Sequence, residues 1–368
     1  MKIAQLTSVH PRHDIRIFVK QCSSLAKAGF SVHFIVADGK GNEEKNGVTI
    51  IDVGDNKGGR IRRMTQTVWR IYSKAVELDA QVYHFHDPEL IPVGMILRMR
   101  GKKVIYDVHE DLPRQILSKS WIKMWLRYPV SWGAAFLEWF ASRFFFSAIV
   151  GATPTITKRF PVKKAINVQN FPIIGELLIE KAFNDRSLAI VYVGGLEKER
   201  GIKQIVNAIS KVNNTQVRLK LAGFFRFKKF EQEISKEQGW DRVDFLGWLD
   251  RQQVSELLSE VRAGLVLFHP EPNHIDAQPN KLFEYMSAGL PVIASDFPLW
   301  RELIDGAGCG LLVDPLKPEE IAKAIDWLLD HPDEAEAMGK RGQKAVMETY
   351  NWAIEEQKLL NIYKGLIK

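Results

Sequence analysis

Short apolar segments rich in β-branched residues alternate with helical patterns along the whole chain of 368 residues. Strands that are separated by helices pair in parallel through crossover connections, so this alternation predicts an α/β fold. We expect strands at 2–7, 31–36, 48–53, 81–85, 103–107 and 148–151 in the first half, and at 189–193, 218–222, 243–246, 264–268, 291–294 and 310–313 in the second.

A chain of this length is too long for one ordinary hydrophobic core, which predicts two domains. A short strand that ends in turn residues, 166–172, lies between the two strand series and marks the expected boundary. Ligands of open parallel sheets bind beyond the carboxyl ends of the strands. We therefore expect a cleft between the two domains.

Charge is distributed unevenly along the chain. Residues 1–165 carry 26 Lys and Arg against 14 Asp and Glu, whereas residues 166–368 carry 25 against 30. A basic half is suited to nucleic acid, an anionic bilayer or a phosphorylated substrate. The overall content of 46% hydrophobic and 26% charged residues is typical of a soluble globular protein.

The composition also argues against several classes of protein. The only two cysteines, Cys22 and Cys309, lie far apart, which indicates a reducing cytoplasm rather than a disulfide framework. We expect no signal peptide, and no stretch reaches the roughly 18 to 20 apolar residues of a membrane span. The dinucleotide motif G-x-G-x-x-G and the P-loop motif are absent, as is Asp-x-Asp, the simplest metal clamp for a nucleotide diphosphate.

Two segments of the second half have the composition of anion sites. Strand 189–193 ends in Gly194-Gly195, where the backbone can approach a ligand, and Arg200 lies beside the start of the next helix. An ordinary tight turn with a solvated arginine explains this segment equally well.

The second segment reads DAQPNKLFEYMSAGLPVIAS, residues 276–295. A helix begins after Pro279, so its free amides and Lys281 can face a phosphate. Glu284 lies one turn further along the helix, where its carboxylate can accept hydrogen bonds from a vicinal diol. A capped surface helix is the alternative, but the apolar residues between these side chains argue for burial.

Together these two segments resemble the family-4 retaining glycosyltransferases. The resemblance rests on strand-Gly-Gly-x4-Arg-Gly-helix and on Pro-Asn-Lys-Leu-Phe-Glu-Tyr-Met-x-Ala-Gly-x-Pro, and it covers the whole chain. It implies the GT-B architecture of two Rossmann-like domains. The first domain, residues 1–168 plus a returning C-terminal helix at 351–368, is expected to bind the acceptor. The second, residues 169–350, is expected to bind a nucleotide-sugar donor.

The resemblance also implies residue roles. The family's acidic pair Glu-x7-Glu is here Asp276 and Glu284, with Glu284 on the ribose and Asp276 at the donor sugar. The family's Arg and Lys of the phosphate loop fall on Gly195 and Arg200, so one of the two cations is absent. The implied donor-binding set is Gly194, Gly195, Arg200, Asn280, Lys281, Leu282 and Glu284, and the implied catalytic set is His109, Arg200 and Asp276.

Histidines and carboxylates end two strands of the basic half, in 82–89 and 104–111. By residue type alone, His84, His86, Asp87, His109, Glu110 and Asp111 could form a metal site, but strand-end histidines more often make local hydrogen bonds. The resemblance instead implies His109 near the reacting carbon of the donor sugar and His86 in the supporting wall. No metal site is expected.

The loop after the first strand carries His10, Arg12, His13, Asp14 and Arg16, a set suited to an acceptor with hydroxyl or phosphate groups. We take His10, Arg12, Asp14, Arg16 and His86 as candidates for the acceptor side. A charged surface loop in which Arg16 forms a structural ion pair is an equal alternative.

A Trp-rich basic segment follows at 119–127. Lys119, Lys123 and Arg127 recur every four residues, and Trp121 and Trp125 lie on an adjacent helical face. Basic, Trp-rich amphipathic segments favour the bilayer interface, so we predict peripheral contact of these five residues with an anionic membrane. Two buried core helices are the alternative.

The sequence therefore predicts an enzyme, a metal-independent retaining hexosyltransferase without a cofactor. It would use a nucleotide-diphosphate sugar, with UDP favoured over GDP, and a glycan or lipid-linked acceptor. The setting implied is bacterial surface polysaccharide or lipopolysaccharide synthesis at the inner face of the cytoplasmic membrane, without nucleic acid. Two rivals stay open, a nucleotide-sugar 2-epimerase of the same architecture and a non-catalytic protein that binds an anionic polymer.

Overall fold

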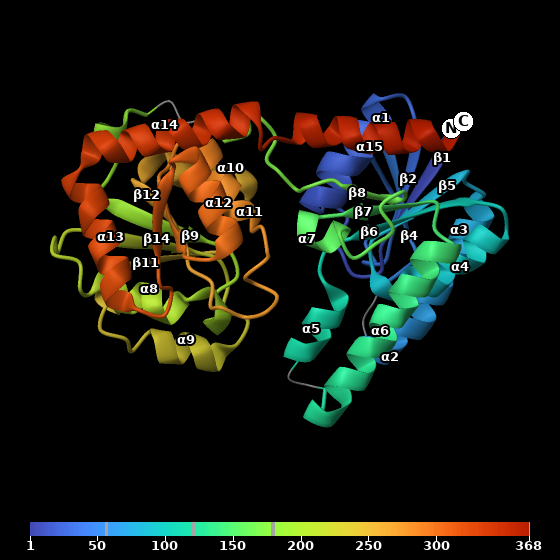
Figure 1. The fold of residues 1–368 in the computed structure, drawn as a ribbon, viewed down its shortest axis with the longest axis horizontal. Helices are drawn as coiled ribbons and strands as arrows, with labels where there is room; N and C mark the ends of the chain where they lie inside the picture. Colours follow the sequence, from blue (N-terminus) through green and yellow to red (C-terminus); the bar gives the residue numbers. More distant parts are fainter. Residues whose placement is uncertain (56–57, 120–121, 178–180, 368) are drawn as a thin grey trace. The chain divides into compact units, whose positions relative to one another are not determined.

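The computed structural model describes residues 1–55, 58–119, 122–177 and 181–367 (Figure 1). The chain divides into two compact units. The first domain comprises Met1–Asn170 and Trp352–Lys368, and the second comprises Phe171–Asn351. The sequence analysis placed the two domain boundaries after residue 168 and before residue 351. Among the described residues, no helix has the length and apolarity that crossing a membrane requires.

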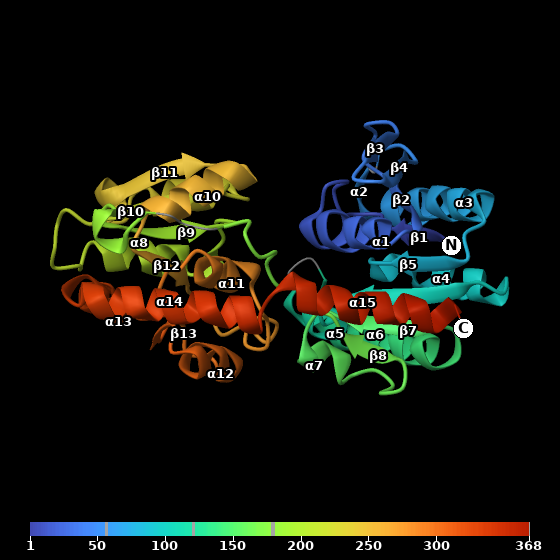
Figure 2. The same ribbon diagram turned by 90° about the horizontal axis from the view of Figure 1, so that it is seen from above.

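The first domain is built on an eight-stranded sheet (Figures 1 and 2). Its strands pair in parallel except for β3, which is antiparallel to β4. In spatial order they are β3 (Glu43–Lys45), β4 (Val48–Asp52), β2 (Ser31–Val36), β1 (Lys2–Leu6), β5 (Val82–Phe85), β6 (Lys103–Val108), β7 (Ala148–Gly151) and β8 (Ala165–Asn167).

Helices connect these strands, and the last helix of the chain returns to this domain. Trp352 Nε1 donates to Ser24 Oγ at 3.0 Å, and Glu355 accepts from the Gln169 amide at 2.9 Å, so the start of the returning helix is anchored. Nearer its end, the Tyr363 hydroxyl lies 2.8 Å from His84 Nδ1. The helices are the π-helical η1 (Ile15–Cys22), α1 (Ser23–Lys27), α2 (Gly59–Arg62), η2 (Arg63–Thr67), α3 (Val68–Leu78), η3 (Pro88–Leu90), α4 (Ile91–Met99), α5 (Leu112–Ser118), α6 (Met124–Phe144), α7 (Pro154–Thr157) and α15 (Trp352–Ile367).

The second domain is built on a six-stranded parallel sheet. In spatial order its strands are β11 (Val243–Gly247), β10 (Arg218–Ala222), β9 (Ala189–Val193), β12 (Ala263–Val266), β13 (Val292–Ser295) and β14 (Gly310–Val313). Its helices are η4 (Phe183–Asp185), η5 (Lys198–Arg200), α8 (Ile202–Ile209), α9 (Lys228–Ile234), η6 (Trp240–Arg242), α10 (Arg251–Glu260), α11 (Asn280–Ser287), α12 (Pro298–Ala307), α13 (Pro318–Asp330) and α14 (Pro332–Glu348).

Each strand expected from the sequence is present, and the α/β prediction is confirmed. The additional strand β3 is polar and lies at the edge of its sheet. It forms a hairpin with β4 through Asn46 and Gly47, both with positive φ. Asn-Gly is the residue pair that favours this turn, whereas the polar strand itself carries no apolar pattern.

The prediction of one amphipathic helix through 119–127 is wrong. Helix α5 ends at Ser118 and α6 begins at Met124, so Lys119 and Lys123 are non-helical cap residues on either side of a break. Arg127 explains the break, because its guanidinium donates to the carbonyls of Leu117 and Ile122. These bonds satisfy carbonyls that a continuous helix would pair internally. Trp121, one of the predicted membrane residues, lies outside the described residues.

Helix α11 lies close against the second sheet because β12 has a glycine at the contact. The ring of Tyr285 covers Gly264, and a Cβ at position 264 would lie 2.3 Å from Tyr285 Cδ2. The Tyr285 hydroxyl accepts a hydrogen bond of 2.9 Å from the amide of Val193, at the end of β9. A side chain at position 264 would therefore displace the helix that carries Lys281 and Glu284.

We expect Gly264→Ala to lower the free energy of unfolding by about 1–3 kcal/mol, the usual cost of overpacking a core. The matched control is Gly306→Ala in α12, where no atom lies within 4 Å of the added Cβ and a small stabilisation is expected. Calorimetry of the full chain measures both variants. Equal stability of the two would contradict the close packing of α11.

Candidate functional site

The order of the strands identifies one position in the second sheet where ligands are expected. From β9 the chain continues through β10 to β11 on one side, then crosses back to place β12 on the other side of β9. Neighbouring strands at such a switch point send their connections to opposite faces of the sheet, which opens a crevice beyond their carboxyl ends. The loops after β9 and β12 border this crevice and lead to helices α8 and α11.

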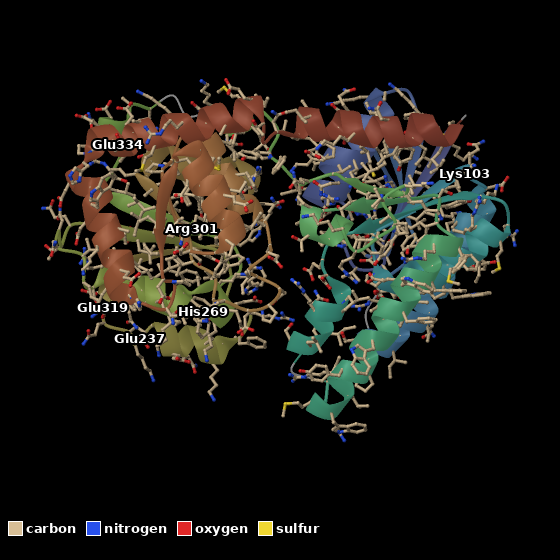
Figure 3. All side chains as sticks on the ribbon, viewed as in Figure 1. Lys103, Glu237, His269, Arg301, Glu319 and Glu334 are labelled. Carbon is tan, nitrogen blue, oxygen red and sulfur yellow. The ribbon has the colours of Figure 1, made fainter. Side chains whose placement is uncertain are left out.

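Hydrogen bonds hold these two loops together. His269, labelled in Figure 3, follows β12, and its amide donates to the Glu199 carbonyl at 2.8 Å. Its Nε2 lies 3.0 Å from Gln204 Oε1 on α8. The oxygen can only accept, so His269 Nε2 carries the proton. The loops after β9 and β12 are therefore fixed relative to each other.

Lys281 is a buried cation at this crevice without a hydrogen-bond partner among the described residues. Only 7% of the residue is exposed, and its Nζ makes no hydrogen bond. The Nζ lies 3.6 Å from the centroid of the Tyr192 ring and 5.6 Å from that of Phe268. Burial, and then the nearby Arg200, hold the pKa of Lys281 well below its usual value. A buried ammonium without a partner is costly, and an anion would relieve that cost.

The glycine turn after β9 makes room for this ammonium. Gly194 has a φ of 135°, and a Cβ there would lie 2.9 Å from Lys281 Nζ. The carbonyl of Gly195 accepts from the Tyr192 hydroxyl at 2.9 Å. Gly201, at the start of α8, has a φ of 70°, and a Cβ there would lie 2.1 Å from the Leu267 carbonyl oxygen. Both glycines occupy left-handed backbone that other residues rarely adopt.

Arg200 is the second cation at the crevice. Its guanidinium carbon lies 4.8 Å from the centroid of the Phe268 ring, the ring that Lys281 also approaches. Its Nε makes no hydrogen bond among the described residues and lies 3.7 Å from a carboxylate oxygen of Glu197. Two cations that share one aromatic neighbour concentrate positive charge where α8 and α11 begin. The amino ends of these helices add to that charge.

Glu284 is held in position by an ion triad. Arg251 NH1 lies 2.6 Å from Glu284 Oε1, and the other two nitrogens of Arg251 bind Glu176 at 2.6 and 3.0 Å. Arg251 is the first residue of α10, whose start is fixed by a capping box between Asp250 and Gln253. The triad orients the Glu284 carboxylate, and the pair with Arg251 occupies one of its two oxygens.

The remaining predicted donor residues lie on the same loop and helix. Asn280 is exposed at the first position of α11, and Asp276 is half-buried in the loop before it. The side chain of Leu282 is fully buried in the core, so only its backbone could meet a ligand. The loop is fixed by Trp300, whose indole donates to the Ala277 carbonyl at 2.7 Å.

A second cluster lies at the switch point of the first sheet, between β1 and β5. Its centre is Asp107, fully buried near the end of β6. Arg16 binds both carboxylate oxygens at 2.8 and 3.1 Å, and Gln21 donates to one of them at 2.6 Å. Burial alone would raise the pKa of Asp107, but Arg16 and the nearby histidines hold it well below its usual value. This ion pair is the structural alternative that the sequence analysis left open for Arg16.

The histidines of this cluster form a chain of hydrogen bonds. His86 Nε2 lies 2.6 Å from Gln5 Oε1, which can only accept, so that nitrogen carries a proton. Burial lowers the pKa of His86 to about 4, although Asp107 Oδ2, 3.3 Å from Nδ1, acts to raise it. His109 Nε2 lies 3.1 Å from this Nδ1 and 3.4 Å from Asp107 Oδ2. A proton on His109 Nε2 can point toward Asp107, and in that tautomer Nδ1 is left as an acceptor.

The first loop contributes His10 and Asp14 to the same cluster. The His10 and His109 ring centroids lie 5.0 Å apart. Burial would lower the pKa of His10, but Asp14 and Asp87 raise it above its usual value. Burial would raise the pKa of Asp14, but His10 and the Ile17 amide lower it to about 2. Arg12 binds outside this cluster, because its guanidinium is buried between Asp38, Glu43 and the Gly41 carbonyl.

Three residues of this cluster, His84, His86 and Asp107, bring potential metal ligands within 4.8 Å of one another. Arg16 and Gln21 already occupy both oxygens of Asp107. The Tyr363 hydroxyl lies 2.8 Å from His84 Nδ1. We therefore interpret the group as a hydrogen-bonded core in which Arg16 supplies the positive charge.

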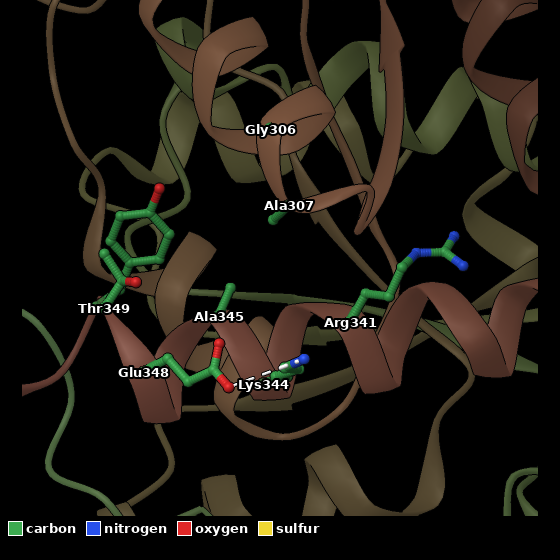
Figure 4. Close-up of a pocket in the computed structure, with 8 residues that line it drawn as sticks. Gly306, Ala307, Arg341, Lys344, Ala345, Glu348 and Thr349 are labelled. Carbon is green, nitrogen blue, oxygen red and sulfur yellow. Dashed lines mark ion pairs between the residues drawn. The ribbon is translucent and has the colours of Figure 1, made fainter.

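A pocket of about 290 Å³ also occurs in the second domain (Figure 4). Its lining comes from the end of α12, from α14 and from Thr349 and Tyr350, not from the loops after β9 or β12. Lys344 and Glu348 pair with each other at its edge, at 3.8 Å. The pocket is therefore separate from the residues described above.

The sequence analysis missed several residues that hold these clusters, namely Gln5, Gln21, Asp107, Tyr363, Glu176, Arg251 and Tyr192. Two of them carried a recognisable signal. Gln5 and Asp107 interrupt otherwise apolar buried strands, and a polar residue in such a place requires a partner. Arg251 and Glu176 lie on separate segments, and neither stands in an unusual local pattern.

Comparison with known proteins identifies both halves of the chain. The family model of glycosyl transferases group 1 matches residues 176–345, and that of glycosyltransferase family 4 matches residues 16–153. Among curated relatives, an alpha-D-kanosaminyltransferase of Streptomyces kanamyceticus is 23% identical over 52% of this chain and 49% of its own length. The chain thus matches about half the length of that relative.

Solved structures share the fold over the full length. A sucrose-phosphate synthase from Thermosynechococcus elongatus aligns with a TM-score of 0.79 at 18% identity, covering 100% of this chain and 99% of that one. Anabaena HepE, solved in complex with UDP-glucose, aligns with a TM-score of 0.76 at 14% identity, covering 99% and 100%. The two family models together span most of the sequence, and the chain belongs to the family-4 glycosyltransferases of GT-B architecture.

Proposed function

We propose that this protein transfers a hexose-type sugar from a nucleotide-diphosphate donor to a hydroxyl group of a glycan or lipid-linked acceptor, with retention at the anomeric carbon. The observation that carries the proposal is the buried ammonium of Lys281, which makes no hydrogen bond to any described residue and lies beside Arg200 at the switch point of the second sheet. A diphosphate would pair with both cations and with the first amides of α8 and α11.

Other residues of the second domain extend this donor site. Glu284, oriented by Arg251, would accept hydrogen bonds from the ribose hydroxyls through the oxygen that Arg251 leaves available. Asp276 would contact hydroxyls of the donor sugar. A UDP-sugar is the donor we favour, since the solved relative HepE holds UDP-glucose.

In the reaction, the bond between the anomeric carbon and the diphosphate oxygen breaks, and a bond to the acceptor oxygen forms on the same face of the sugar. The acceptor's proton passes to the departing diphosphate. The electron pair of the broken bond leaves with the diphosphate, so negative charge develops there before the proton is taken up, and Arg200, Lys281 and the helix amides would stabilise that charge without a metal. His109, with its Nδ1 as acceptor, would bind a hydroxyl of the sugar. His10, Asp14 and His86 would line the acceptor side, and Arg12 and Arg16 would support it through their ion pairs.

The setting we propose is bacterial surface polysaccharide synthesis, including lipopolysaccharide, with the protein peripheral on the inner face of the cytoplasmic membrane. The excess of 26 basic over 14 acidic residues in 1–165 supports contact with an anionic leaflet.

The proposal is tested by measuring thermal stabilisation with UDP, GDP, UDP-glucose and GDP-mannose, followed by analysis of the sugar product. A glycoside formed with release of nucleoside diphosphate supports transfer. Nucleotide released with a free epimerised sugar would indicate the epimerase instead. Stabilisation by a polyanion but by none of the four nucleotides would indicate the polymer-binding alternative.

We expect Glu284→Ala to weaken UDP binding roughly ten- to hundredfold, the scale of hydrogen bonds to a charged group. The variant should bind 2′,3′-dideoxy-UDP as weakly as the wild type does, because that ligand lacks the hydroxyls. Titration calorimetry measures both ligands, and Glu302→Ala, an exposed carboxylate on α12, is the control. An unchanged affinity for UDP would refute the ribose assignment.

We expect Arg200→Ala to lower kcat by roughly 10²–10³-fold, the usual loss for one preorganised group that stabilises charge in the transition state. Lys203→Ala is the matched control, because this cation on α8 pairs with Glu233 and Glu237 instead. Steady-state assays of UDP release with the identified donor measure both. Comparable kcat values for the two variants would remove Arg200 from the reaction.

A further inference from the structure

Helix α6 carries a row of exposed aromatic side chains on one face. The row consists of Trp125, Tyr128, Trp132, Phe136 and Trp139, whose exposed fractions range from 44% to 72%. They are separated by three, four, four and three residues, the spacing that places side chains on a single face of an α-helix. We call these five residues the aromatic stripe.

The opposite face of α6 fixes the helix to its domain. Ser131, Glu138, Ala141 and Ser142 are buried there. Glu138 accepts from the Tyr106 hydroxyl at 3.1 Å and from Arg159 at 2.7 Å, and Ser131 donates to the Pro113 carbonyl on α5 at 2.9 Å. These hydrogen bonds fix the buried face of α6 to the domain, so the aromatic stripe points outward. The helix has 21 residues and would be roughly 30 Å long.

The charges around the stripe are of one sign. Residues 112–147 contain five basic residues and a single acidic residue, Glu138, which is buried and paired with Arg159. Two exposed cations flank the stripe, Lys123 at the start of α6 and Arg143 near its end. The Arg143 guanidinium carbon lies 4.7 Å from the centroid of the Trp139 ring, so the charge sits directly beside the aromatic surface.

We propose that the aromatic stripe of α6 docks on an anionic lipid bilayer, with the helix lying in the plane of the interface. Trp and Tyr are the residues enriched at the level of lipid headgroups, and exposed Lys and Arg beside them favour anionic lipids. A second copy of the chain fits less well, because two such faces would bring like charges together. This surface takes the place of the helix predicted at 119–127. Lys123 and Trp125 belong to both.

The test is sedimentation of the full chain with vesicles of equal parts phosphatidylglycerol and phosphatidylcholine, and with vesicles of phosphatidylcholine alone. We expect binding to the anionic vesicles that weakens with salt. The triple variant Trp132→Ser, Phe136→Ser, Trp139→Ser should bind roughly tenfold more weakly or worse, since the buried apolar area sets the affinity. Trp69→Ser and Trp248→Ser remove equally exposed tryptophans elsewhere and should bind as the wild type does.

A second variant separates charge from apolar contact. Lys123→Gln with Arg143→Gln should lower binding to anionic vesicles and leave any binding to phosphatidylcholine unchanged. Equal binding by the wild type and the triple variant would overturn the proposal, as would a wild type that binds neither vesicle. A wild-type dimer in light scattering that the triple variant dissociates would assign the stripe to a second copy. This proposal rests on the membrane setting proposed above and names the surface that makes the contact. Vesicle binding is independent of sugar transfer, so the docking surface and the transferase activity can fail separately.

Discussion

A parallel sheet brings the carboxyl ends of all its strands to one edge, and the order of the strands determines where along that edge a ligand can enter. In both sheets of this protein the order reverses beside the first strand of the domain, β1 in one and β9 in the other. The histidine cluster of the first domain lies on and after β1, β5 and β6, and the two cations of the second domain follow β9 and β12. The position of each site thus follows from the topology, and the side chains determine what each site binds.

The two sites treat buried charge in opposite ways. In the first domain Asp107 is buried with Arg16 and Gln21, so its charge is compensated within the protein. In the second domain the ammonium of Lys281 lies against the rings of Tyr192 and Phe268 and makes no hydrogen bond to any described residue. A protein keeps such an uncompensated group where a ligand supplies the missing charge, at a cost to its own stability. This contrast is the physical reason for placing the diphosphate in the second domain.

Much of the fold follows from local sequence patterns. The buried parallel strands are apolar runs, so their positions could be predicted, whereas the polar edge strand β3 could not. The four-residue spacing of Lys119, Lys123 and Arg127 suggested one helix, but the contacts of Arg127 with Leu117 and Ile122 end α5 and separate it from α6. Periodicity could not reveal this, because the deciding contacts are made by a side chain to backbone carbonyls.

The candidate sites were predictable to a different extent. The motif at 279–295 placed Lys281 and Glu284 at the start of a helix, where the structure has them. Their partners could not be predicted, because contacts such as Arg251 with Glu284, or Tyr363 with His84, join segments that are distant in sequence. Such pairs carry no local signal, and only the folded chain brings them together.

The central claim, that Lys281 is held for a diphosphate, is tested most directly by Lys281→Met, measured for stability and for UDP affinity together. Methionine has a similar volume and packs well against the Tyr192 ring, so the change removes the charge with little loss of contact. We predict that the unliganded variant is more stable than the wild type by about 1 kcal/mol or more, while its UDP affinity falls roughly hundredfold. A less stable variant that binds UDP as tightly as the wild type would contradict the account.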